Sequence, residues 1–216
     1  DDNGVDILAG IEAFGGTVTG VAKGNGPDFA PLVEAALADG ADCIASGVSP
    51  IEFAALLRAV AGRVPITTVD ASVPEGLATS LGSEVDGVHV VSGFLLPGSG
   101  HPETVALVEA SEELGPDVSL DQFWFSGYVG LQLVAEALEG ADESNAAATL
   151  AGLTTISGYD SGVGPVIDFS TPNANPALSQ LFNPELYLWE IVGGQYQLLQ
   201  EDTIDMSSAI ELVTRG

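Results

Sequence analysis

Few side chains in this 216-residue sequence could carry out catalysis. It has two histidines, His89 and His101, and one cysteine, Cys43. His89 lies in an apolar β-like run and His101 in a Gly/Pro-rich loop, so we expect a structural and a solvated role. Cys43 lies in a short apolar stretch, which predicts a buried, unreactive thiol. There is no HExxH, GxxxxGK[ST] or GxSxG motif, and nothing singles out a carboxylate pair. We therefore expect no catalytic residue, no metal site and no cofactor.

The charge balance excludes two classes of partner. The chain has 31 acidic and 4 basic residues, a formal net charge of -27. Binding to nucleic acid or to an anionic membrane surface needs clustered Lys and Arg, which four scattered cations do not supply. No apolar run is long enough to span a bilayer, so we expect a protein that is not transmembrane. We interpret the acidity as a feature that supports solubility.

Helical and strand-like periods alternate through the first part of the chain, and glycine or proline marks most boundaries. The predicted helices cover residues 5–14, 29–39, 51–62 and 74–80, and the predicted strands cover 17–21, 42–46, 65–69 and 87–91. This order is typical of an α/β protein with a doubly wound, mostly parallel sheet and flanking helices. Because a parallel crossover needs a strand before its first helix, we expect a strand to precede Asp1.

The second part of the chain has a different order of predicted elements. A Gly/Pro-rich break at 92–102 is followed by predicted helices at 103–114, 121–139 and 144–152, a glycine-rich stretch with short β segments at 154–172, and a hairpin at 186–200. Residues from 201 on form a last helix or a linker. The helices have no parallel strands of their own to cover. They either share the first sheet or pack on a sheet outside this sequence.

Several short motifs, taken in order, resemble one protein family. They are Asp2-Asn3-Gly4, Ala13-Phe14-Gly15-Gly16, Pro27-Asp28-Phe29-Ala30-Pro31-Leu32-Val33, Phe125-Ser126-Gly127-Tyr128 and the run 162–169. The chain resembles the type I periplasmic binding proteins, and among them the branched-chain amino-acid (Leu/Ile/Val) receptors of ABC transporters. The resemblance spans most of residues 2–200.

The resemblance implies a type I periplasmic binding protein fold whose first lobe is largely missing, so that the chain looks N-terminally truncated. Residues 1–91 would then form the second lobe. Residues 92–153 would form the lobe crossing and helices that return toward the first lobe. Residues 154–200 would hold the late β segments and a hinge crossing, and 201–216 a tail.

The same resemblance implies ligand-binding roles for Asn3, Ser49, Asp70, Ala71 and Tyr128. Asp70 would pair with the ammonium group of an amino acid. Each polar position also has an ordinary structural interpretation: Asn3 and Ser49 could cap helices, Asp70 could be a turn residue, and Tyr128 could belong to the core. Asp70 and Ser49 both follow predicted strands, and open α/β sheets bind ligands outside the carboxyl ends of their strands.

The implied function is non-enzymatic capture of a small molecule, an amino acid or a similar compound, between two lobes. The ligand would be delivered to the permease of an ABC transporter. The implied location is extracytoplasmic, in the periplasm or as a cell-surface lipoprotein. A ligand-sensing domain of the same fold is the alternative, and an acidic hydrolase is a further one.

Overall fold

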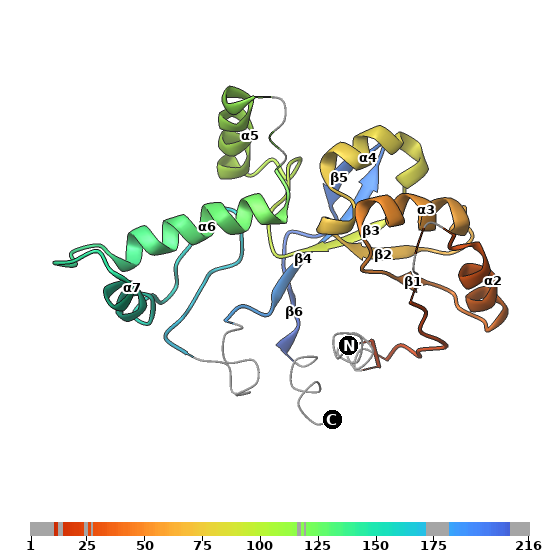
Figure 1. Ribbon diagram of the computed structural model, residues 1–216, viewed down its shortest axis with the longest axis horizontal. Helices are drawn as coiled ribbons and strands as arrows, with labels where there is room; N and C mark the ends of the chain where they lie inside the picture. The colour runs from red at the N-terminus through yellow and green to blue at the C-terminus, as the bar shows by residue number, and fades with distance from the viewer. Residues whose placement is uncertain are drawn as a thin grey trace.

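The computed structural model describes residues 11–12, 15–23, 26, 28–115, 118, 120–171 and 182–207. Figure 1 shows two regions of different construction. The sheet region holds the six strands formed by the described residues, with helices α2 to α4. The helical region holds helices α5 to α7, and in this view α6 and α7 extend away from the sheet.

The sheet has a parallel part and an antiparallel part. Strands β1 (Ile44–Ala45), β2 (Ile66–Val69) and β3 (His89–Ser92) are parallel neighbours. A hairpin of β4 (Glu185–Val192) and β5 (Gln195–Leu198) then adds antiparallel strands, so that the order is β1-β2-β3-β4-β5. A sixth strand, β6 (Ile204–Asp205), pairs with the start of β4.

Helices of the sheet region begin and end where the sequence supplies proline and glycine. They are α2 (Ala30–Ala38), α3 (Pro50–Val60) and α4 (Glu75–Leu81), with single 3-10 turns η1 (Asp70–Ser72) and η2 (Gly82–Val85). Pro50 occupies the first turn of α3, where the missing backbone N–H costs nothing. Gly40, at φ +86, directly follows the C-cap residue of α2, a conformation that glycine adopts without strain.

The core of the sheet region follows the period-two alternation of the strands. Ile66, Val90, Trp189 and Ile191 are each at most 3% exposed, and their neighbours along the strands are more exposed. Buried side chains of α3 and α4 complete the same cluster: Phe53, Leu56, Leu57, Val60, Ala78 and Leu81. The parallel strands are therefore held by a continuous apolar layer, which fixes the positions of their ends.

The helical region begins after the Gly/Pro-rich break. Its helices are α5 (Pro102–Leu114), α6 (Gln122–Ala137) and α7 (Ala146–Leu153). Asp121 caps α6 by accepting hydrogen bonds from the backbone N–H groups of Phe123 and Trp124, both at 3.0 Å. Helices α6 and α7 approach closely at Gly152, where an added Cβ would lie 1.9 Å from the carbonyl oxygen of Ala137. Within the residues described, no helix is both long and apolar enough to cross a membrane.

The α/β class and the parallel β1–β2–β3 unit expected from the sequence are confirmed, and every helix predicted between residues 29 and 152 is present. The first predicted helix, 5–14, lies outside the described residues except for positions 11 and 12, which are helical.

Three expectations are wrong. Residues 17–21 are not a strand, because nothing in the described part of the chain pairs with their backbone. Cys43 is exposed, because it precedes a two-residue strand at the sheet edge that offers little cover. Residues 204–205 form strand β6 rather than a helix or a linker, since they find free backbone groups on β4.

Candidate ligand site at the strand ends

The carboxyl ends of β1, β2 and β3 meet at one edge of the sheet because these strands are parallel. Ser46 follows β1, Asp70 follows β2 and Ser92 ends β3. We call these three residues the strand-end site. Chain segments far apart in sequence thus place a carboxyl group and two hydroxyl groups along one edge.

Asp70 is the centre of this arrangement. It is 3% exposed. The Ser92 hydroxyl donates a hydrogen bond to Oδ2 of Asp70 at 2.6 Å, and the backbone N–H of Ala71 donates to Oδ1 at 2.8 Å. The Ser92 oxygen in turn accepts a hydrogen bond from the N–H of Phe94 at 3.1 Å. These contacts fix the carboxyl group between η1 and the loop that follows β3.

The electrostatic surroundings of Asp70 do not favour its charge. Burial is the largest effect and raises the pKa of the Asp70 carboxyl. The negative charge of Asp121 raises it further, while the hydrogen bonds from Ser92 and Ala71 act in the opposite direction. In the described part of the chain, none of the groups that hydrogen-bond to Asp70 or shift its pKa is a cationic side chain. A buried carboxylate without a positive partner is stabilised by a cation that reaches it.

Ser46 adds a second polar group that lacks a partner. Its hydroxyl oxygen is shielded from solvent, and no hydrogen-bond partner for it exists among the described residues. The backbone around it is fixed, because the Thr68 hydroxyl donates to the Ser46 carbonyl at 3.0 Å. The neighbouring loop is also tied down, since the Ser72 hydroxyl donates to the carbonyl of Val48 at 2.7 Å. A buried hydroxyl without a partner is costly, so this one is a candidate contact for a ligand.

Ser49 and Ala71 flank this edge in different ways. Ser49 is exposed and is the N-cap residue of α3. Its hydroxyl and its backbone N–H both donate to Oε2 of Glu52, at 2.7 and 3.1 Å. These bonds lower the pKa of Glu52 and form part of a capping box. Ala71 is half-buried, and its N–H is used by Asp70.

Tyr128 lies farther along α6, seven residues beyond Asp121 and so about 10 Å along the helix at 1.5 Å per residue. Its hydroxyl donates to Oε1 of Glu103 at 2.7 Å, and its ring stacks on Trp124 with centroids 5.7 Å apart. Burial and the Glu103 carboxylate raise its pKa to about 12, so the phenol stays protonated at neutral pH. Asn3, the remaining predicted residue, lies outside the described part of the chain.

Ser46, Ser92 and Asp121 were not predicted as site residues. Ser46 and Ser92 could have been found, because each is the polar residue at the end of a predicted strand, as Asp70 is. Asp121 could not, because its approach to Asp70 depends on the path from β3 through α5 to α6, which no local pattern specifies.

A cavity with a volume of about 540 Å³ lies elsewhere, between the loops at 95–102 and 160–166. Tyr187, Leu198 and Glu201 complete its walls, and none of the predicted site residues lines it. Among the described residues, no group of three or more His, Cys, Asp or Glu side chains could hold a metal ion.

Comparison with known proteins places this geometry in a family. A family model described as "Periplasmic binding protein" matches residues 2–183. No curated protein sequence matches the chain significantly.

Solved structures share its fold at low identity. The leucine binding protein LivK from Thermotoga maritima is 16% identical, with a TM-score of 0.67 over 90% of this chain and 53% of its own. A branched-chain amino-acid ABC transporter protein from Thermus thermophilus with bound valine is 12% identical, with a TM-score of 0.68 over 88% of this chain and 53% of its own. A fatty acid ABC transporter substrate-binding protein from Thermomonospora curvata is 18% identical, with a TM-score of 0.71 over 89% of this chain and 51% of its own.

The chain spans about half the length of these solved structures. The family and the fold are those of solute-binding proteins rather than of enzymes. With a family match that covers most of its residues and the α/β fold that the solved relatives share, this chain belongs to the periplasmic binding proteins, with the fold of type I.

Proposed function

We propose that this chain supplies one wall of a site that captures a small molecule bearing an ammonium group, an amino acid in the first instance. The observation that carries the proposal is Asp70, a buried carboxyl at the strand ends whose described contacts are all neutral donors. An ammonium group would give this carboxylate the positive partner that it lacks. The unpartnered hydroxyl of Ser46 would contact a polar atom of the same ligand.

The other residues predicted from the sequence have supporting roles in this proposal. Ser49 and Ala71 would lie beside the ligand. Their hydrogen bonds to Glu52 and Asp70 hold the backbone at this edge in place. Tyr128 would contribute from α6, and Asn3 would be a further contact. The solved relatives carry leucine, valine or fatty acid in their names, so the ligand class rests on Asp70 and not on the comparisons.

The second wall would come from another lobe seated on the helical region. Helix α6 has one apolar side packed in the core, which includes Phe125, Val129 and Leu133. On its other side Phe123 and Leu131 are 71% and 73% exposed. A helix that is apolar on both sides is normally buried between two layers. We therefore propose that residues 102–153 face a first lobe, in keeping with the double length of the solved relatives.

Closure of two such lobes would bury the ligand, and its release to the permease of an ABC transporter would follow reopening. This scheme places the protein outside the cytoplasm, where such receptors meet their ligands. A single wall binds weakly, since half of the ligand remains in water, and we expect a dissociation constant near 1 mM for this chain alone.

The test compares leucine with 4-methylpentanoate, which has the same carbon skeleton and carboxylate but no ammonium group. At about 10 mM leucine, a dissociation constant of about 1 mM raises the free energy of unfolding by about 1.4 kcal/mol, or roughly 3–5 °C in Tm. We expect this shift for leucine and none for 4-methylpentanoate.

The variant Asp70→Asn should lose the leucine shift. The matched control is Asp39→Asn, which removes the same charge from an exposed position at the end of α2, before β1 and so at the opposite sheet edge. Equal shifts for both compounds, or an unchanged leucine shift in Asp70→Asn, would contradict the proposal.

A further inference from the structure

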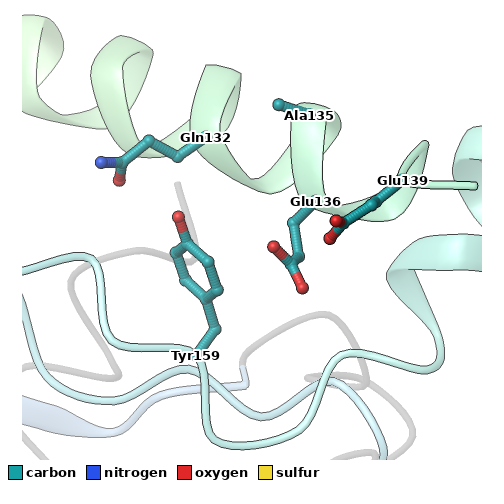
Figure 2. Close-up of a pocket in the computed structure, with 5 residues that line it drawn as sticks. All are labelled: Gln132, Ala135, Glu136, Glu139 and Tyr159. Atoms are coloured by element: carbon teal, nitrogen blue, oxygen red, sulfur yellow. The ribbon is translucent and has the colours of Figure 1, made fainter.

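A second cavity lies along α6, apart from the strand-end site. Its volume is about 410 Å³, and Gln132, Ala135, Glu136, Glu139 and Tyr159 line it. Gln132, Ala135 and Glu136 lie on one side of α6, because Ala135 and Glu136 follow Gln132 by three and four residues. Glu139 lies in the turn that follows the helix. Figure 2 shows the Tyr159 ring rising from the loop opposite the helix, toward the side chains of Gln132 and Glu136. The volume lies in the range of small-molecule sites.

The two carboxylates of this cavity are exposed to solvent and lack a positive partner among the described residues. Glu136 and Glu139 form no ion pair within the described residues, where the recorded pairs join Arg58 to Glu84 and Arg63 to Glu34. The amide oxygen of Gln132 is shielded from solvent and has no hydrogen-bond partner there either. A buried acceptor without a donor is uncommon and calls for an explanation.

Tyr159 contributes an aromatic face. Burial raises the pKa of its phenol, and the negative charges of Glu136, Asp160 and Glu103 raise it further, so the ring stays neutral. Electron-rich rings beside carboxylates attract ammonium groups and the CH₂ groups next to them. A metal ion fits less well, because the described residues hold no cluster of three ligating side chains.

We propose that this cavity binds a small organic cation of the aliphatic diamine class. The Glu136 and Glu139 carboxylates would neutralise its ammonium groups, the Gln132 amide oxygen would accept an N–H hydrogen bond, and the Tyr159 ring would cover the alkyl chain. The inference is independent of the strand-end site. Phe123, Gly127 and Val134 lie on the opposite side of α6, whereas the exposed Leu131 lies one turn before Ala135 and borders the cavity.

The experiment titrates 1,4-diaminobutane into the 216-residue chain by NMR, with 1,4-butanediol as the uncharged probe of the same length. We expect the diamine to shift the amide signals around Gln132, Glu136 and Tyr159, and the diol to shift none of them. The Glu136→Gln and Glu139→Gln variants should each weaken diamine binding by about tenfold, because each removes a charge-assisted hydrogen bond.

The matched control is Glu113→Gln, which removes one charge from an exposed position on α5 and should change the affinity by less than about twofold. Ala135→Leu keeps every charge and fills the cavity, so it should also weaken binding by about tenfold. The proposal is overturned if the diamine shifts no pocket amide at about 10 mM, if the diol binds equally well, or if Glu136→Gln and Glu113→Gln behave alike.

Discussion

The helices of the sheet region and of the helical region differ in the apolar surface they expose. Among the described residues, α2 to α4 carry one exposed large apolar side chain, Ile51, and α5 to α7 carry six. In the sheet region Phe53, Val90 and Trp189 are fully buried. In the helical region Phe123 and Leu131 of α6 and Leu150 of α7 are 71%, 73% and 65% exposed. Helix α7 has no buried residue at all within its bounds. The sheet region therefore carries its own core, whereas the helical region presents apolar surface suited to a further layer.

The largest predicted effect comes from a substitution in the core of the sheet region. Trp189→Ala should lower the free energy of unfolding by about 3–5 kcal/mol, because it removes the largest fully buried side chain. Trp189→Phe is the milder comparison, since it keeps a ring and removes an indole N–H that has no partner among the described residues. Urea unfolding measures both. If Trp189→Ala lowers the free energy of unfolding by less than about 1 kcal/mol, the sheet region is not the more stable of the two regions.

The next effect concerns the contact between α6 and α7. Gly152→Ala places a methyl group against the Ala137 carbonyl, so it should cost about 1–3 kcal/mol and release α7. Gly127→Ala is the matched control in open space, and it should stabilise α6 by up to about 1 kcal/mol. Hydrogen exchange of the 146–153 amides should speed up in the first variant alone. Equal exchange in both would mean that the two helices do not pack as described.

A smaller effect separates function from stability at Asp70. Because burial raises its pKa, the folded state binds more protons than the unfolded state between the ordinary and the raised pKa. The free energy of unfolding should therefore fall as the pH rises through that range.

Asp70→Asn should remove this dependence and add about 1 kcal/mol of stability at neutral pH, while leucine binding is lost. Chemical denaturation at several pH values tests this. If Asp70→Asn is less stable than the unchanged chain and still binds leucine, then Asp70 has a structural role and not a ligand-binding one.

The smallest effect lies on the outer face of α6. Leu131→Ser changes a side chain that is already 73% exposed, so it should alter the stability of this chain by less than about 0.5 kcal/mol. Joined to a first lobe, the same change should cost several times more. A loss above about 1.5 kcal/mol in the chain alone would mean that this face is already covered.

Local chemistry predicted most of the helices and the parallel strands. Proline in the first turn marks α3, and glycine beyond the last turn marks the end of α2. Asp70 was placed correctly after β2 because the strand before it is short and made of β-branched residues.

The errors share a physical cause: the outcome depended on a partner distant in sequence. Residues 17–21 have strand-like composition but find no partner strand in the described chain, and β6 exists only because β4 offers free backbone groups. Cys43 has apolar neighbours in sequence but lies at a sheet edge. The link from Asp70 to Ser92 spans 22 residues and follows from the register of β2 against β3.

The most direct test of the central claim maps leucine onto the chain by amide NMR. The account predicts fast-exchange shifts, saturating near millimolar leucine, at residues 46–48, 70–72 and 92–94, with no comparable shifts around Gln132 and Tyr159. Leucine that perturbs none of the three strand ends at about 10 mM, or that perturbs only the α6 cavity, would contradict the assignment of the ligand site to Asp70.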